Sequence, residues 1–304
     1  MTYTQLLNTA LELLDEQGPQ QAFDFMQQQY ANPAQLYNFS YCLAAMCDRT
    51  DEAMGLLKEA VYTHGYWYDY TYLMEDEDLE PLRSIPEFET IANLCRQRQQ
   101  AAQQAAQPVL CCEETQPNKP VVLVLHGDQQ NAAITLPYWQ PVKQMGYALA
   151  AAQSTELQVS DGYLWDDEEQ AAEQLASHWK NLQEQGVQVE NSILGGFSSG
   201  GRAALYAVLS GAVAPKGLIL VAPWLPELEE WTEDLSALKA AGTRVYICCG
   251  DADEDCFEGS EQLFELLDEA GVEVDFKLCP DLDHDYPENF DRLLKEAIDF
   301  VAGE

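Results

Sequence analysis

A serine with a glycine two residues to either side stands in the run Gly-Phe-Ser-Ser-Gly at residues 196–200. The run fits the pattern G-x-S-x-G with Ser198 at its centre, because centring it on Ser199 would place Phe197 where the first glycine is needed. An apolar, strand-like run precedes the motif and a helix-like run follows it. In that context the serine occupies a tight turn that presents its hydroxyl as a nucleophile. The alternative is a glycine- and serine-rich turn without chemistry.

Four histidines are available as the base that a nucleophilic serine requires. The unperturbed pKa of histidine suits proton transfer near neutral pH. His64 falls in the first, helical part of the chain, His178 lies inside a predicted helix, and His126 follows the first strand, upstream of the serine. Only His284 follows the serine and lies just beyond the last predicted strand. We therefore predict His284 as the base, and we expect His126 to stabilise its own loop.

Several carboxylates follow the predicted strand at residues 244–249, in the run Gly-Asp-Ala-Asp-Glu-Asp that begins at Gly250. An acid at this place would orient the imidazole and stabilise its protonated form. From the residues alone, Asp251, Asp253 and Asp255 all remain candidates. The alternative is a solvated acidic turn.

The elements that must position these groups are short apolar strands alternating with amphipathic helices after Pro120. Strands are predicted at residues 121–125, 147–152, 192–197, 217–221, 244–249 and 272–278, and helices at 167–185, 199–209, 259–270 and 288–301. Unbroken apolar strands that alternate with helices predict a mostly parallel sheet covered on both faces. Ligands of such sheets bind at the carboxyl ends of the strands, where the candidate serine, acid and histidine all lie.

The chain up to residue 105 has a different pattern, with apolar residues recurring at helical spacing. The small residues Ala22 and Ala53 stand 31 residues apart after polar turns, near the roughly 34-residue period of tetratricopeptide repeats. The run YCLAAMCDRTDEAMGLLKEAV resembles one such repeat, and residues 78–91 resemble a segment that closes such arrays; a generic helical bundle is the alternative. A linker with a short strand at 109–113 follows, so we predict an all-α domain over residues 1–105 and an α/β domain over 106–304.

Four runs of the second domain together resemble a known family: VLVLHGDQQN, ILGGFSSGG, CCGDADEDC and PDLDHDYP. The domain resembles a small α/β-hydrolase of the carboxylesterase and dienelactone hydrolase type. The resemblance implies Ser198 as nucleophile, Asp253 as acid and His284 as base, with the backbone N–H groups of Ser199 and Asp128 as the oxyanion hole. Such enzymes often carry a small or apolar residue where this chain has Asp128, and a carboxylate at that place could oppose an oxyanion.

Four aromatic residues follow strands at the same edge of the predicted sheet and are candidates for lining a substrate pocket. They are Tyr138, Trp139, Trp165 and Trp224. Structural packing is the alternative for each of them.

The composition limits the partners that the protein can have. Fifteen Lys and Arg residues against 52 Asp and Glu residues give a formal net charge of −37. This charge repels nucleic acid and anionic membrane surfaces, so we expect neither as a partner. The nine cysteines form no repeated C-x-x-C spacing, so no metal site is expected. The first residues show no secretory signal, and we expect a cytoplasmic protein.

These expectations converge on a serine hydrolase that cleaves small-molecule carboxylic esters through an acyl-enzyme, without a cofactor. Thioesters and lactones remain possible substrates, because fold and nucleophile do not choose the leaving group. We expect the helical domain to shape substrate access, with a peptide or protein partner as the alternative role of its helices. A non-catalytic interaction module on a hydrolase scaffold is the alternative for the whole chain.

Overall fold

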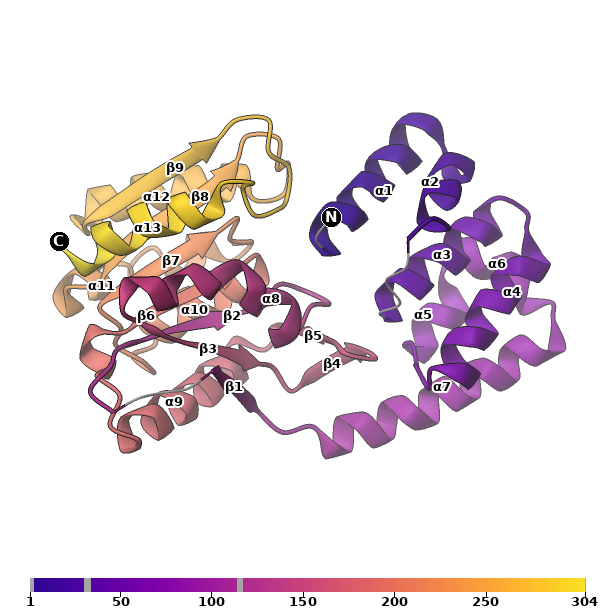
Figure 1. The fold of residues 1–304 in the computed structure, drawn as a ribbon, viewed down its shortest axis with the longest axis horizontal. Coiled ribbons are helices and arrows are strands. Elements are labelled where there is room, and N and C mark those ends of the chain that lie inside the picture. Colours follow the sequence, from indigo (N-terminus) through magenta and orange to yellow (C-terminus); the bar gives the residue numbers. More distant parts are fainter. Residues whose placement is uncertain (1–2, 30–33, 114–116, 304) are drawn as a thin grey trace. The chain divides into compact units, whose positions relative to one another are not determined.

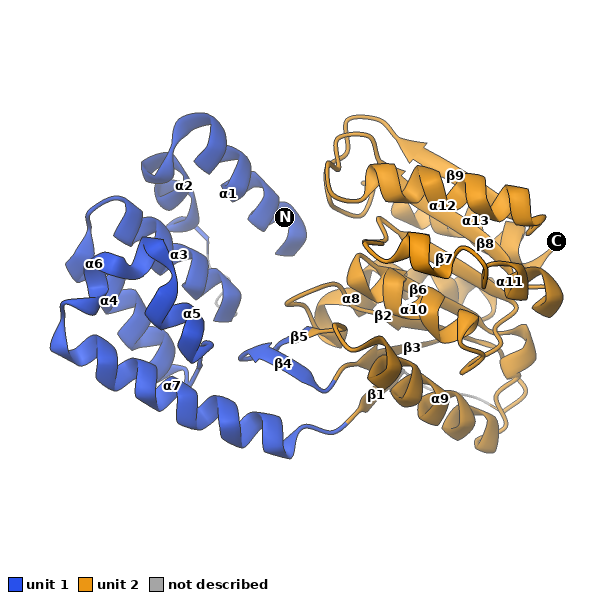
Figure 2. Cartoon of the chain, turned by 180° about the vertical axis from the view of Figure 1, so that it is seen from behind, with its two compact units in different colours: residues 1–107, 155–163 blue, residues 108–154, 164–304 orange. Residues whose placement is uncertain are grey.

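The computed structural model describes residues 3–29, 34–113 and 117–303. The chain forms two compact units (Figure 2). One unit comprises residues 1–107 together with 155–163, and the other comprises residues 108–154 together with 164–304. The chain therefore passes from one unit to the other three times.

The first unit is built from helices, as the apolar spacing predicts (Figure 1). Neighbouring helices of the chain pack against each other, and Ala22 and Ala53, both fully buried, allow two such contacts to be close. The long last helix is amphipathic and contributes Phe88 and Ile91 to the core. The helical segments are α1 (Tyr3–Gln17), α2 (Pro19–Met26), α3 (Ala34–Met46), α4 (Thr50–Lys58), η1 (Glu59–Thr63), α5 (Tyr70–Glu75), η2 (Glu77–Leu79), α6 (Glu80–Arg83) and α7 (Pro86–Ala105).

A hairpin from the second half of the sequence completes the helical unit. Its strands are β4 (Glu156–Val159) and β5 (Gly162–Leu164), and Leu157 and Val159 pack against the helical core. The Trp67 backbone N–H donates to the Ser160 hydroxyl at 2.7 Å, and the Ser160 N–H donates to the Trp67 carbonyl at 3.1 Å. Sequence analysis predicted no such hairpin. The signal for it was the Asp161-Gly162 pair, which favours a tight turn, and Asp161 has a positive φ of 58°.

The second unit contains the predicted mostly parallel sheet. Its strand order is β1-β3-β2-β6-β7-β8-β9, with β1 antiparallel to β3 and every other pair parallel. The short strand expected in the linker is β1, at the edge of the sheet. The strands are β1 (Val109–Glu113), β2 (Val121–Leu125), β3 (Ala148–Gln153), β6 (Ile193–Phe197), β7 (Gly217–Val221), β8 (Arg244–Gly250) and β9 (Val274–Cys279).

Helices cover both faces of this sheet, because successive residues of its buried strands point to opposite sides. In β2, Val121, Leu123 and Leu125 join the core under one group of helices, while Val122 and Val124 join the core on the other face. The first group contains α9 (Glu168–Glu184), α10 (Ser199–Leu209), α11 (Ser236–Ala241) and α12 (Phe257–Ala270). The opposite face is covered by α8 (Ala132–Trp139), η3 (Gln140–Met145) and α13 (Phe290–Ala302).

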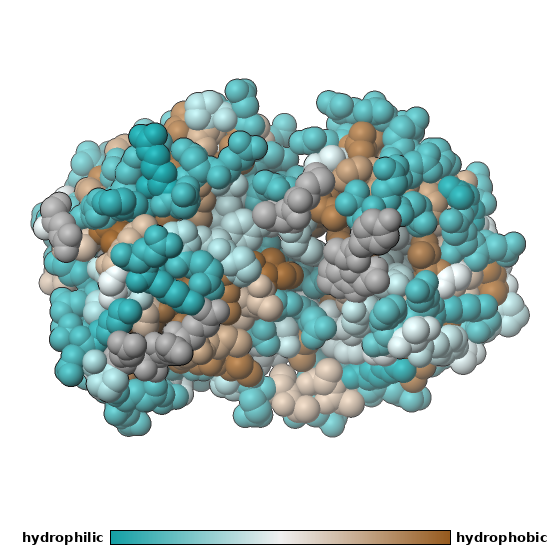
Figure 3. All heavy atoms as spheres, in the orientation of Figure 1, coloured by the Kyte–Doolittle hydropathy of each residue, from teal (hydrophilic) through white to brown (hydrophobic). Residues whose placement is uncertain are grey.

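The surface is rich in hydrophilic side chains on the face shown in Figure 3. Among the described residues, the large hydrophobic side chains that are exposed are Leu11, Met46, Tyr62, Val109 and Leu278. None of the described helices combines the length and the apolar content that a membrane crossing needs.

Candidate active site

The motif around Ser198 forms a strained turn between β6 and α10. Ser198 has φ 54° and ψ −126°, a left-handed conformation that is unusual for a residue with a side chain. A Cβ atom on Gly196 would lie 2.3 Å from the Gly200 carbonyl oxygen, and one on Gly200 would lie 2.3 Å from the His126 carbonyl oxygen. Both flanking glycines are therefore required, because the start of α10 approaches β6 at Gly196 and the end of β2 at Gly200 too closely for any side chain.

A buried carboxylate and a half-exposed histidine form a hydrogen-bonded pair beyond β8 and β9. His284 Nδ1 donates to Asp253 Oδ2 at 2.7 Å, and Asp253 is 1% exposed. The other oxygen of Asp253 accepts a hydrogen bond from the Cys256 backbone N–H at 3.0 Å, which fixes the carboxylate. The His284 ring lies 4.8 Å, between ring centroids, from the ring of Phe197, the residue directly before Ser198. The pair thus lies beside the turn that carries the candidate nucleophile.

The structure distinguishes the three carboxylates that the sequence left open. Asp253 is the one that contacts His284. Asp251 instead accepts a hydrogen bond from the backbone N–H of Asp281 at 2.7 Å, and Asp255 is exposed.

The two residues predicted to supply the oxyanion hole contact each other through their side chains. The Ser199 hydroxyl donates to Asp128 Oδ1 at 2.5 Å. Ser199 is the first residue of α10, where a backbone N–H has no acceptor within the helix. The Asp128 carboxylate is partly desolvated, which raises its pKa, and the hydrogen bond from Ser199 opposes that rise. The side chain of Asp128 therefore joins its loop to the start of α10.

His126 is built into the core beneath this loop. It is fully buried, and desolvation lowers its pKa to about 4, so the imidazole is neutral at neutral pH. The Ser154 backbone N–H donates to Nε2 at 3.3 Å, so the proton resides on Nδ1, which donates to the Gly127 carbonyl at 2.8 Å. Both nitrogens of the neutral His126 ring are hydrogen-bonded to backbone groups, so His126 holds the loop after β2 in place.

Arg202 joins several loops at this edge, and sequence analysis missed it. It is 3% exposed, and Nη1 donates to Glu227 at 3.0 Å while Nη2 donates to the Trp165 carbonyl at 2.7 Å. Its guanidinium also lies 4.9 Å from the centroid of the Trp224 ring. The Trp165 indole N–H in turn donates to the His126 carbonyl at 3.1 Å. The only signal in the sequence was an arginine one helical turn after the candidate nucleophile.

The aromatic candidates divide into two groups, and two of them need correction. Trp139 and Trp165 are 0% exposed, so they are packing residues that offer no surface to a substrate. Trp139 lies against Gly195 and donates from its indole N–H to the Tyr286 hydroxyl at 3.2 Å. Tyr138 and Trp224 are partly exposed, so both remain available to contact a substrate.

The buried carboxyl of Asp285 yields a prediction about stability and pH. Burial raises its pKa from 3.8 to about 6, so the folded protein binds this proton more tightly than the unfolded chain does. Stability from this group is therefore highest below pH 4 and is lost as the pH rises through 6. We expect Asp285→Asn to raise the unfolding free energy by up to about 3 kcal/mol at pH 8 and by little at pH 4.

Thermal unfolding at both pH values checks this expectation. Asp283→Asn removes the same charge from the neighbouring exposed residue, and its effect should be small at either pH. An equal gain from the two variants at pH 8 would assign the effect to net charge instead.

Comparisons with known proteins identify the family. Residues 107–302 match the family model "Phospholipase/Carboxylesterase", and residues 2–103 match the model "A/B hydrolase-like, N-terminal domain". The chain belongs to the phospholipase/carboxylesterase family, whose members hydrolyse esters, and it has a mostly parallel α/β-hydrolase sheet preceded by a helical domain.

Solved structures show the same fold. The crystal structure of an uncharacterized protein from Bacillus cereus ATCC 10987 is 40% identical, with a TM-score of 0.58 and 99% of each chain covered. A Bacillus cereus carboxylesterase is 21% identical over 66% of this chain and 98% of its own, with a TM-score of 0.51. A phospholipase/carboxylesterase from Dyadobacter fermentans DSM 18053 is 20% identical over 64% of this chain and 96% of its own, with a TM-score of 0.50. No curated protein matches the chain.

Proposed function

We propose that this protein is a serine hydrolase that cleaves small-molecule carboxylic esters through an acyl-enzyme intermediate. The observation that carries the proposal is the 2.7 Å hydrogen bond from His284 to the buried Asp253, beside the strained turn of Ser198. Two chain segments that are far apart in the sequence thus supply a base and its orienting acid next to a nucleophile elbow.

Each residue then has a defined role in the reaction. His284 takes the proton of the Ser198 hydroxyl as its oxygen attacks the ester carbonyl, and the imidazolium that forms is stabilised by Asp253. The backbone N–H groups of Ser199 and Asp128 donate to the oxyanion of the tetrahedral intermediate. His284 then protonates the leaving alcohol. Water hydrolyses the acyl-enzyme by the same steps in reverse, so no cofactor is required.

Treating the folded, full-length chain with a fluorophosphonate probe tests the proposal. Such a probe phosphonylates an activated serine, so one label per chain is expected, and peptide mass spectrometry should place it on Ser198. Hydrolysis of p-nitrophenyl acetate should be lost in proportion to labelling. A folded chain that neither takes the label nor hydrolyses the ester would favour the non-catalytic scaffold.

We further propose that the helical unit influences which esters are accepted. The chain enters this unit a second time at residues 154–155, directly after β3, and leaves it again at residues 163–164, directly before Trp165. Trp165 is joined to both Arg202 and His126, so the hairpin segment is continuous with the network behind the oxyanion loop.

A truncation of the helical unit must take account of the hairpin. We expect a fragment of residues 106–304 to self-associate, because Leu157 and Val159 lose the core against which they pack. The same fragment with residues 155–163 replaced by a short Gly-Ser linker should stay monomeric in light scattering. Its relative rates on esters of increasing chain length should differ from those of the full chain, and identical rates would contradict the proposed influence.

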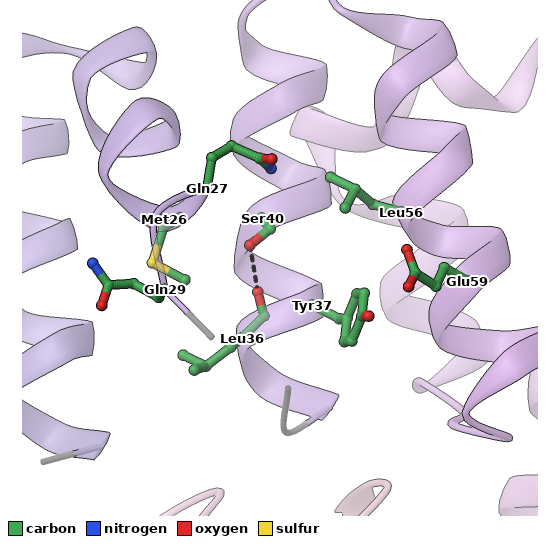
Figure 4. Close-up of a pocket in the computed structure, with 8 residues that line it drawn as sticks. All are labelled: Met26, Gln27, Gln29, Leu36, Tyr37, Ser40, Leu56 and Glu59. Carbon is green, nitrogen blue, oxygen red and sulfur yellow. Dashed lines mark hydrogen bonds between the residues drawn. The ribbon is translucent and has the colours of Figure 1, made fainter. Parts of the chain in front are cut away.

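A second candidate function of the helical unit is to bind a peptide or protein partner. It is favoured by a pocket of about 130 Å³ between α2, α3 and α4, with Leu36 and Leu56 on its wall and the Glu59 carboxylate at its rim (Figure 4). A cavity of roughly this volume holds one benzene ring. Such a pocket suits a single side chain of a partner.

A further inference from the structure

The carboxylate of Asp128 is the feature of the proposed site that ester hydrolysis itself does not explain. Asp128 is exposed, whereas Ser199, which donates its hydroxyl to Asp128 Oδ1 at 2.5 Å, is completely buried. The Asp128 carboxylate therefore lies between the buried Ser199 hydroxyl and the solvent. Ser199 and Asp128 are also the residues whose N–H groups would bind the oxyanion, so a negative side chain lies beside the place where negative charge develops.

The groups around Asp128 show what compensates this charge in the free protein. His284 and Arg202 attract it, and Asp166 repels it. Arg202 is already engaged by Glu227 and by the Trp165 carbonyl, and it is buried. A neutral ester brings no positive charge of its own to offset the Asp128 carboxylate beside the oxyanion.

We propose that Asp128 selects esters that carry an ammonium group close to the scissile carbonyl. This inference rests on the proposed serine hydrolase function and adds a substrate class to it. A substrate cation next to Asp128 would pair with the carboxylate and remove its opposition to the oxyanion. An anionic substrate would add repulsion, so the same residue discriminates against carboxylate- and phosphate-bearing esters.

Two esters of the same shape test this selectivity in the full-length protein. One is p-nitrophenyl trimethylammonioacetate, and the other is p-nitrophenyl 3,3-dimethylbutyrate, in which a carbon atom replaces the charged nitrogen. Spontaneous hydrolysis is subtracted with the Ser198→Ala variant. The ammonium group itself activates the ester carbonyl, so we expect the ratio of kcat/KM for the cationic ester to that for the neutral one to exceed the ratio of their hydroxide-catalysed rate constants.

Asp128→Asn removes the charge but keeps an oxygen that accepts the hydrogen bond from Ser199. The ratio of kcat/KM for the cationic ester to that for the neutral ester should fall about tenfold, equivalent to about 1.4 kcal/mol. The neutral ester should react faster than with the parent chain, because the charge that opposes the oxyanion is removed. Loss of the structural contact between Asp128 and Ser199 would slow the hydrolysis of both esters, so it would not produce opposite changes for the two.

Glu254→Gln is the matched control, because it removes one charge from an exposed residue of the loop beyond β8. An unchanged ratio in Asp128→Asn, or an equal fall in Glu254→Gln, would overturn the inference. Should Asp128→Asn not fold, a parent chain whose kcat/KM ratio for the two esters does not exceed the ratio of their hydroxide-catalysed rate constants would overturn it equally. Fluorophosphonate labelling distinguishes failure of the proposed selectivity from failure of the proposed serine mechanism. A labelled chain without cation preference contradicts only the selectivity, whereas a folded chain without labelling contradicts the serine mechanism.

Discussion

Replacement of Ser198 by alanine is expected to lower kcat for ester hydrolysis by about 10⁴-fold or more. Alanine lacks the hydroxyl oxygen that attacks the ester carbonyl, and the turn between β6 and α10 places no other nucleophile there. The residual rate would come from the oxyanion donors and from substrate binding. Stopped-flow or steady-state hydrolysis of p-nitrophenyl acetate measures the loss, and fluorophosphonate labelling should disappear with it.

Ser199→Ala is the matched control for this change. Ser199 follows Ser198 directly, but its hydroxyl is buried and donates to Asp128. Its backbone N–H, the group that would bind the oxyanion, is retained in alanine. We therefore expect labelling to persist in Ser199→Ala, with a reduced rate. Labelling that is lost from Ser199→Ala and retained in Ser198→Ala would reverse the assignment of the nucleophile.

The second large effect is expected at Asp253. Asp253→Asn should lower kcat by about 10⁴-fold, because an amide that donates to His284 Nδ1 would hold the imidazole in the wrong tautomer and would leave its cation unstabilised. The KM should change little, since the buried Asp253 side chain offers no surface to a substrate. The measurement is the full dependence of rate on ester concentration.

Asp251→Asn and Asp255→Asn are the matched controls, since each removes one carboxylate from the same loop without contact to His284. Both should retain most of the activity. Asp253 also accepts the hydrogen bond from the Cys256 N–H, so circular dichroism must show that the variant is folded. A folded Asp253→Asn with nearly full activity would remove this residue from the mechanism.

The sequence by itself determined the features that depend on local spacing. Gly196 is required by a contact within one strand–turn–helix segment, as the 2.3 Å approach of the Gly200 carbonyl oxygen to a Cβ atom on Gly196 shows. The strands after Pro120 were predictable because burial on both faces demands continuous apolar runs, such as Val121–Leu125. His284 could be singled out because histidine is rare in this chain and strand ends meet at one edge of a parallel sheet.

Only the tertiary structure decided which side chains meet across long sequence separations. The choice among Asp251, Asp253 and Asp255 depends on side-chain direction within one loop, which composition and period do not encode. The burial of Trp139 and Trp165 depends on packing against segments that are distant in the sequence, as does the role of Arg202.

The hairpin at residues 156–164 shows the same limit most clearly. Its apolar residues Leu157 and Val159 are too few to form a core of their own, and their partners are helices of the same unit that lie far earlier in the sequence. Local pattern specifies that a strand pair can form. The hydrophobic surface that stabilises it exists only once residues separated by nearly a hundred positions, such as Trp67 and Ser160, have come together.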